Sequence, residues 1–247
     1  MIVKIDDLNI YLEKSGRKGR PIILLHGWGQ NTQMMAFIAE FLKKHFVVYN
    51  LDLPGFGQSD EPKTAWGVLD YTDFLYHFCE KYKIDNPIII AHSFGCRIAV
   101  RFAYKYKADK LVLTGAAGVK DKHSIAWYFK TYTYKLAKQL FPEAAKSYSQ
   151  KVGSDDYKNT SGIMRQTFVK VVNDDIKPIL KDIRNETLLV FGSKDDATPL
   201  EKGELMEQLM QNATLIVFEG DDHFAYINQA VRFNAVLDAF LKEDYNG

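Results

Sequence analysis

The stretch Pro87-Ile88-Ile89-Ile90-Ala91-His92-Ser93-Phe94-Gly95-Cys96-Arg97-Ile98-Ala99-Val100 decides the fold. Its β-branched apolar run predicts a buried strand, and the residues after the polar pair His92-Ser93 become apolar again at helical spacing. The simplest structure for this pattern is a strand, a sharp turn and a helix, with Ser93 at the apex. The positions two before and two after such an apex must be small, and they are Ala91 and Gly95.

The sharp turn gives Ser93 a functional interpretation. A strained backbone at this point is expected to have a function, because it exposes the Ser93 hydroxyl above the strand end, next to the positive end of the following helix. A small-x-Ser-x-Gly match alone is weak, because about 0.2 matches are expected by chance in a chain of this length. The alternative is a serine that only caps the helix. The rest of the chain decides between the two.

Composition limits the classes of protein to which the chain can belong. Its 247 residues are 47% hydrophobic and 13% aromatic, which is enough for one large α/β domain. Lysine and arginine number 32 and aspartate and glutamate 31, so the charge gives no reason to expect a nucleic-acid partner. We find no secretory signal and no apolar run of about 18 residues, and we expect no membrane association. Cys79 and Cys96 lie in apolar helical patterns, which predicts reduced, buried thiols in a cytoplasmic protein.

Strands and helices alternate along most of the chain. Strands are predicted at residues 3–5, 9–12, 21–25, 46–51, 87–91, 109–114, 187–191 and 214–218. The segments between most of them carry apolar residues three and four apart, which predicts helices. This alternation predicts an α/β fold with a mostly parallel, doubly wound sheet that is covered on both faces. An antiparallel hairpin opens it, with its turn at Asp6-Asp7.

The pattern changes between residues 118 and 178, where it is helical and contains no predicted buried strand. We expect this segment to form an inserted helical cap, or lid, and residues 1–117 and 179–247 to form the core. The aromatic side chains of this segment suggest a substrate that is partly apolar or aromatic, although we expect more than half of them only to pack the cap on the core. The candidate substrate-binding residues are Trp28, Trp127, Tyr128 and Tyr132.

Residues suited to chemistry follow four of the predicted strands. They are Ser93, the segment 192–199 with Asp195, the segment 219–224 with His223, and the segment 26–28 with Trp28. In an open parallel sheet, ligands bind at the carboxyl ends of the strands. These four segments are therefore expected to meet in one site.

With these residues in this order the chain resembles the α/β-hydrolase superfamily over nearly its whole length. The resemblance implies that Ser93 is the nucleophile and that His223, in a Gly-x-x-His-Phe sequence, is the base. It implies Asp195 as the acid, because residues 192–199 fit the pattern Gly-x-x-Asp-x-x-x-Pro, although Asp196 is a rival. It also implies that the backbone N–H groups of Trp28 and Phe94 form the oxyanion hole.

The chemistry explains why these residue types are needed together. A serine hydroxyl is a poor nucleophile near neutral pH, so an imidazole must accept its proton. A carboxylate on the other imidazole nitrogen fixes the tautomer and stabilises the cation. Amide donors stabilise the negative oxygen of the tetrahedral intermediate. We therefore predict a serine carboxylesterase that acts on a small-molecule ester through an acyl-enzyme.

Several alternatives to this prediction stay open. A carbon–carbon bond hydrolase of the same fold is the enzymatic alternative, and a low-turnover ligand receptor is the non-enzymatic one. The sequence His26-Gly27-Trp28-Gly29 resembles esterases that act on acyl-carrier methyl esters, and the eight lysines between Lys120 and Lys158 would suit an anionic acyl carrier protein. Two departures from the family pattern, Ala91 and Cys96 in place of glycine, weaken assignment to one subfamily. The sequence does not predict the oligomeric state.

Other polar residues receive structural interpretations. His26 and His92 are expected to place the backbone and to pack, and Asp52 with Ser59 to form a turn and a cap. Asp221 and Asp222 could be a solvated turn that only raises the pKa of His223. His45, His77 and His123 show no ligand spacing, so neither a metal nor a cofactor is predicted.

Overall fold

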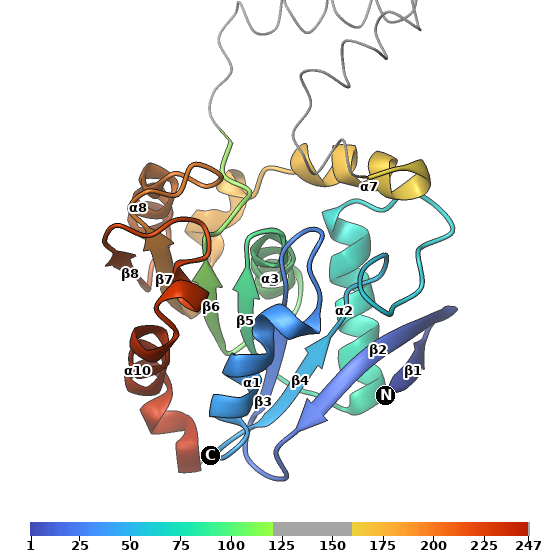
Figure 1. Cartoon of the computed structure of the whole chain (residues 1–247), viewed down its shortest axis with the longest axis horizontal. Coiled ribbons are helices and arrows are strands. Elements are labelled where there is room, and N and C mark those ends of the chain that lie inside the picture. Colours follow the sequence, from blue (N-terminus) through green and yellow to red (C-terminus); the bar gives the residue numbers. More distant parts are fainter. Residues whose placement is uncertain (121–159, 247) are drawn as a thin grey trace, which may run out of the picture.

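An eight-stranded sheet forms the centre of the computed structural model, which describes residues 1–120 and 160–246. The strands are β1 (Ile2–Ile5), β2 (Leu8–Ser15), β3 (Pro21–Leu25), β4 (Val47–Leu51), β5 (Ile88–His92), β6 (Lys110–Thr114), β7 (Glu186–Gly192) and β8 (Ala213–Phe218). Their order is β1-β2-β4-β3-β5-β6-β7-β8 (Figure 1). Strands β3 to β8 pair in parallel, and β2 pairs antiparallel with β1 and β4. The predicted mostly parallel sheet and its opening hairpin are confirmed.

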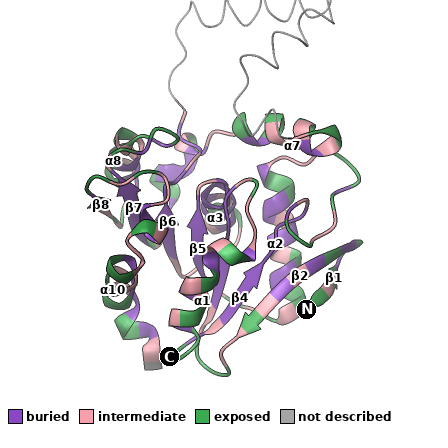
Figure 2. Cartoon of the chain, in the orientation of Figure 1, coloured by how far each residue is buried: buried purple, intermediate pink, exposed green. Residues whose placement is uncertain are grey.

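Burial along the strands follows their place in the sheet. Every residue of the central strand β5 is buried, whereas the first residues of β2 alternate between buried and more exposed. A strand that is covered on both faces needs a continuous apolar sequence, and a strand near the edge needs an alternating one. The sequences of β5 and β2 differ in this way, and Figure 2 shows the fully buried centre of the sheet.

Helices cover both faces of the sheet. The longer ones are α1 (Ala36–Leu42), α2 (Val68–Tyr82), α3 (Phe94–Lys105), α7 (Gly162–Val172), α8 (Leu200–Leu209) and α10 (Ala230–Leu241). Shorter helical segments are η1 (Thr32–Met35), η2 (Lys177–Asp182), α9 (Ala225–Asn228) and η3 (Lys242–Asn246). Buried side chains of α2, α3 and α8 form one core cluster with the sheet, and those of α1 and α10 form a second. The two clusters are the two layers of a doubly wound fold. None of the helices in the described part of the chain is long and apolar enough to cross a membrane.

The carboxyl ends of β5 and β6 point toward the end of the sheet where α7 lies (Figure 1). Both α7 and the first residues of η2 fall within the predicted cap segment, and both are helical. Residues 121–159, which include Trp127, Tyr128 and Tyr132, lie outside the described residues. The division into a core and an inserted cap therefore stays a prediction.

Candidate active site

Ser93 lies at the apex of the turn between β5 and α3. Its φ of 49° and ψ of −108° place a non-glycine residue in a conformation that costs about 1–3 kcal/mol. The turn can be this tight because residue 95 is a glycine. A Cβ at this position would lie 2.5 Å from the carbonyl oxygen of Leu25. The Ser93 N–H donates to the Thr114 carbonyl at 3.0 Å. The predicted strand, turn and helix are confirmed.

The Thr114 carbonyl is a shared acceptor beneath this turn. It accepts a hydrogen bond from His92 Nδ1 at 3.1 Å and another from the Cys96 thiol at 3.6 Å. Cys96 also donates to the Ala91 carbonyl at 3.3 Å. Burial raises the pKa of the Cys96 thiol, and it raises the pKa of Cys79 to about 12. Both cysteines are buried and unpaired, as predicted.

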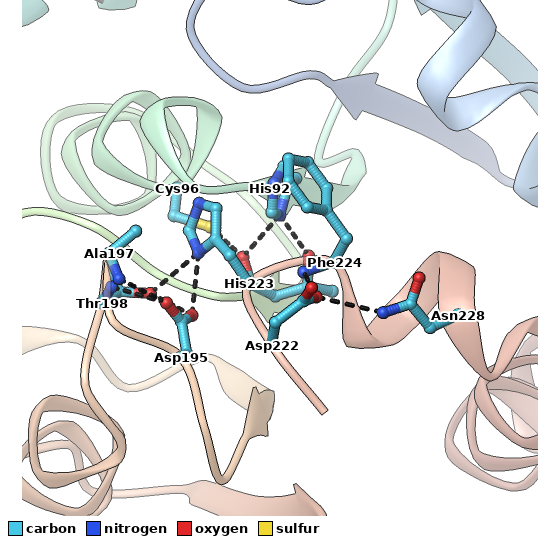
Figure 3. Close-up of polar contacts among 10 residues, drawn as sticks. His92, Cys96, Asp195, Ala197, Thr198, Asp222, His223, Phe224 and Asn228 are labelled. Carbon is cyan, nitrogen blue, oxygen red and sulfur yellow. Dashed lines mark hydrogen bonds and ion pairs between the residues drawn. The ribbon is translucent and has the colours of Figure 1, made fainter. Parts of the chain in front are cut away.

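Asp195 and His223 form a direct contact. Asp195 follows β7 and His223 follows β8, and these strands are parallel neighbours. His223 Nδ1 lies 2.8 Å from Asp195 Oδ2 (Figure 3). The Asp195 side chain is fully buried. Because a carboxylate only accepts, Nδ1 carries the proton and Nε2 is left as an acceptor.

Three more donors fix the Asp195 carboxylate. The backbone N–H groups of Ala197 and Thr198 donate to Oδ1 at 2.9 and 2.8 Å, and the Thr198 hydroxyl donates to Oδ2 at 2.7 Å. Burial by itself would raise the pKa of Asp195, but the hydrogen bonds from His223 and Thr198 outweigh it and hold this pKa below its usual value. Thr198 was not identified from the sequence. Its signal is the Asp-x-x-Thr spacing, in which an aspartate bonds the backbone just ahead of it.

The rival carboxylates have other surroundings. Asp196 is exposed, and it does not cap the next helix, since Pro199 occupies the N-cap position of α8. Asp222 accepts from the N–H of Phe224 at 2.8 Å and from the side chain of Asn228 at 3.0 Å (Figure 3). It therefore belongs to the turn that starts α9. The structure brings Asp195, and not Asp196, to the imidazole.

Two glycines make room for His223. A Cβ on Gly115, whose φ is +49°, would lie 2.9 Å from His223 Nδ1. A Cβ on Gly192 would lie 2.3 Å from the carbonyl oxygen of Asp222. The end of β7 can therefore approach the loop that carries the imidazole.

Ser93 and His223 line the same cavity, which has a volume of about 440 Å³. Trp28 and Phe94 also line it. The backbone N–H groups of Trp28 and Phe94 donate to no acceptor within residues 1–120 and 160–246. An oxyanion hole requires amide donors that are not bound elsewhere, and among the described residues these two N–H groups meet that condition.

Three aromatic rings pack around Trp28, which lines this cavity. The indole lies 4.9 Å from Phe56, 5.4 Å from Phe94 and 5.0 Å from Phe168, measured between ring centroids. Phe168 belongs to α7, so one aromatic residue of the predicted cap segment does line the cavity. The predicted contribution of Trp127, Tyr128 and Tyr132 lies outside the described residues.

His26 holds the loop that carries Trp28. Its Nδ1 lies 2.7 Å from the Gly27 carbonyl, and its Nε2 accepts from the Leu53 N–H at 2.9 Å. Full burial lowers the pKa of His26 to about 4, so the ring is neutral at neutral pH. The role in backbone placement that the sequence predicts is confirmed.

The loop after β4 has the turn chemistry that was predicted for Asp52 and Ser59. The Asp52 carboxylate accepts from the N–H groups of Thr32 and Gln58, each at 2.7 Å. The Ser59 hydroxyl donates to the Asp52 carbonyl at 2.6 Å. These groups are used in holding the loop.

His92 packs behind the imidazole of His223, with ring centroids 4.7 Å apart. Burial, and then repulsion from His223, lowers the pKa of His92 to about 3. His92 is therefore a neutral packing residue, as predicted. As for metals, the residues that the structure describes contain no group of three or more His, Cys, Asp or Glu side chains placed to hold an ion.

Two polar residues of the cavity were not identified from the sequence. Gln30 accepts from the Gly27 N–H at 3.0 Å, and Arg97 lies one helical turn after Ser93. The only local signal for Arg97 is a charged residue in the otherwise apolar first part of α3.

Comparison with known proteins agrees with this architecture. Residues 20–160 match the family model described as "alpha/beta hydrolase fold". The chain belongs to the α/β-hydrolase family. A second model, described as "TAP-like protein", matches residues 168–244 of this α/β hydrolase.

Three curated relatives span this α/β hydrolase almost from end to end. An AB hydrolase superfamily protein, YisY, of Bacillus subtilis is 26% identical and covers 95% of this chain and 96% of its own. A 2-hydroxy-6-oxo-2,4-heptadienoate hydrolase of Pseudomonas putida is 26% identical, and the match covers 90% of this chain and 89% of the relative. A pimeloyl-[acyl-carrier protein] methyl ester esterase of Legionella pneumophila is 24% identical, covering 95% and 100%. The relatives include hydrolases of more than one bond type.

Solved structures share the fold of this α/β hydrolase. A variant of a meta-cleavage product hydrolase superposes with a TM-score of 0.76 at 22% identity, covering 98% of both chains. An esterase from Exiguobacterium antarcticum also superposes with a TM-score of 0.76. It is 21% identical, and the match covers 98% of both chains. Family membership supports hydrolase activity in this chain.

Proposed function

We propose that this α/β hydrolase cleaves a carboxylic ester through an acyl-enzyme on Ser93. The observation that carries the proposal is the shared cavity, which is lined by Ser93, by His223 with its imidazole held by Asp195, and by Trp28 and Phe94. The proposed roles are nucleophile for Ser93, base for His223 and acid for Asp195. Trp28 and Phe94 provide the oxyanion hole.

The first half of the reaction forms the acyl-enzyme. Ser93 Oγ bonds to the ester carbonyl carbon as its proton passes to His223 Nε2, and the carbonyl oxygen becomes negative. The N–H groups of Trp28 and Phe94 stabilise that charge, and removing one such donor elsewhere costs about 10²–10³ in rate. When the intermediate collapses, the carbon–oxygen bond breaks and the proton on Nε2 leaves with the alcohol.

The second half releases the acid and restores the serine. A water molecule gives a proton to His223 Nε2 and attacks the acyl carbon, and Ser93 recovers a proton as the ester bond to it breaks. Asp195 stays ionised throughout. Its hydrogen bonds from Ala197 and Thr198 hold the carboxylate in one orientation, so the imidazole keeps the tautomer that the reaction needs.

A carbon–carbon bond hydrolase is the second candidate, because the Pseudomonas putida relative is a 2-hydroxy-6-oxo-2,4-heptadienoate hydrolase. The same nucleophile and base would serve it. For the ester itself we propose a small, partly apolar molecule, since Trp28 and Phe168 border the cavity. A carrier-bound acyl group is a further candidate, tested by comparing a free methyl ester with the same group on an acyl carrier protein. The two unpaired cysteines are in keeping with a reducing, cytoplasmic location.

Steady-state kinetics on the purified chain tests the proposal. We expect sustained turnover of 4-nitrophenyl butyrate, and a much lower kcat/KM for 2-hydroxy-6-oxo-2,4-heptadienoate. A single burst without turnover would identify a receptor. A dienoate that is cleaved far faster than any ester would identify the carbon–carbon hydrolase.

A further inference from the structure

Arg97 is a buried cation in the wall of the cavity that contains Ser93. It lies four residues after Ser93, near the start of α3. Arg97 is only 9% exposed, and it lines the same cavity as Ser93 and His223. A guanidinium is therefore within reach of a molecule that is bound to the serine.

Most hydrogen-bond donors of Arg97 have no acceptor within residues 1–120 and 160–246. A guanidinium has five N–H donors, and the single bond that Arg97 forms with the described residues is from Nη1 to the backbone carbonyl of Asp174. The nearby carboxylates are engaged elsewhere. Asp174 pairs with Arg101 at 2.7 Å, and Asp175 accepts from the N–H groups of Lys120 and Lys177 at 3.3 and 3.0 Å.

The charge around Arg97 is also incompletely balanced. Among the residues that the structure describes, Arg97, Arg101 and Lys120 face the two carboxylates Asp174 and Asp175, which leaves one excess positive charge. Burial lowers the pKa of Arg97, although both carboxylates oppose this, and a guanidinium stays charged at neutral pH. A buried charge is costly unless it is paired, and an anion in the cavity would pair it. The N-terminus of α3 favours the same sign of ligand.

We propose that Arg97 binds a carboxylate on the acyl part of the substrate, so that this hydrolase prefers half-esters of dicarboxylic acids. The inference rests on the proposed function and names its substrate class. A carboxylate fits the planar guanidinium, which can donate two parallel hydrogen bonds to it.

Arg101 is the matched control for this inference. It is on the same helix, carries the same charge and contacts the same Asp174, but it does not line the cavity. If Arg97 only tethered the chain at Asp174, losing either arginine would change stability and leave substrate preference unaltered. A change in preference that is confined to Arg97 separates binding from tethering.

The experiment compares mono-4-nitrophenyl adipate, which is anionic, with its methyl-capped diester, which is neutral. We expect the ratio of kcat/KM for the anionic to the neutral ester to fall about 10- to 150-fold in Arg97→Gln, because a hydrogen bond to a charged group is of that strength. The ratio should stay at the wild-type value in Arg101→Gln and fall less in Arg97→Lys. An unchanged ratio in a folded Arg97→Gln protein would overturn the inference.

A binding measurement keeps the test independent of turnover. Adipate should raise the unfolding temperature of the wild type and of Arg101→Gln, and adipamide should not. Equal effects of adipate and adipamide on the wild type would overturn the inference even if Arg97→Gln does not fold. Hydrolysis of neither ester, with adipate still binding through Arg97, would instead overturn the proposed function.

Discussion

Replacing Asp195 by asparagine should nearly abolish turnover and leave the fold in place. The amide oxygen of asparagine can still accept the N–H groups of Ala197 and Thr198, now 2.9 and 2.8 Å from Oδ1. The amide nitrogen, however, would face His223 Nδ1 and donate to it. The proton of the imidazole would then lie on Nε2, which could no longer accept one from Ser93.

The size of this effect follows from the contact between Asp195 and His223. A charge pair about 4 Å apart, at an effective dielectric constant of about 20, is worth about 4 kcal/mol. This corresponds to a factor of roughly 10³ in rate, and the wrong tautomer raises the expected loss to roughly 10⁴. The depressed pKa of Asp195 means that the ionised carboxylate stabilises the fold at neutral pH, and that this contribution is lost as the pH falls through the folded-state value. Asp195→Asn should therefore also unfold at a slightly lower temperature.

The assay is kcat for a 4-nitrophenyl ester, with circular dichroism to show that each variant is folded. Asp196→Asn is the control, since that side chain is exposed and one residue away. It should keep kcat within about twofold, because surface substitutions away from special contacts have small effects. The reasoning is refuted if Asp196→Asn is the inactive variant, or if folded Asp195→Asn keeps a tenth of the wild-type rate.

Three further predictions concern the surroundings of the site. Thr198→Val removes the 2.7 Å hydrogen bond to Asp195 Oδ2 and should lower kcat about 10-fold, far less than Asp195→Asn; an equal loss would contradict this. Gly95→Ala should lower the free energy of unfolding in urea by about 1–3 kcal/mol or more, since the alanine Cβ would lie 2.5 Å from a backbone oxygen. Unchanged stability would show that the turn relaxes. For His26, the folded-state pKa of about 4 lies below the unfolded value, so the unfolded chain binds more protons between pH 6.5 and pH 4. Its contribution to the unfolding free energy should fall by about 1.4 kcal/mol per pH unit of acidification in that window, and His26→Gln should lack this slope.

Much of the fold could be predicted because its strands, helices and sharp turn each have a sequence pattern only a few residues long. Buried parallel strands such as β5 need continuous apolar sequences, and the turn at Ser93 needs small residues at fixed offsets. The resemblance to the family pattern Gly-x-x-Asp-x-x-x-Pro, which fits Gly192, Asp195 and Pro199, favoured Asp195 over Asp196. The order of the strands, with β3 between β4 and β5, depends on pairing between distant segments, so no local sequence pattern predicts it.

The parts of the site that were not predicted depend on contacts across the chain. In the sequence, Arg97 is a charged residue within an apolar helix. In the structure its guanidinium donates to the backbone carbonyl of Asp174, 77 residues later, and this contact holds it in the cavity wall. The positive φ of Gly115 has no local sequence signature, but the structure shows that it makes room for His223.

A covalent label tests the central claim most directly. A fluorophosphonate reacts with an activated serine, and mass spectrometry of the digested protein then locates the adduct. We predict one adduct, on Ser93, which is absent from Ser93→Ala and strongly reduced in Asp195→Asn, with loss of ester hydrolysis in proportion to labelling. An adduct on another serine such as Ser59, or full labelling of Asp195→Asn, would contradict the proposed active site.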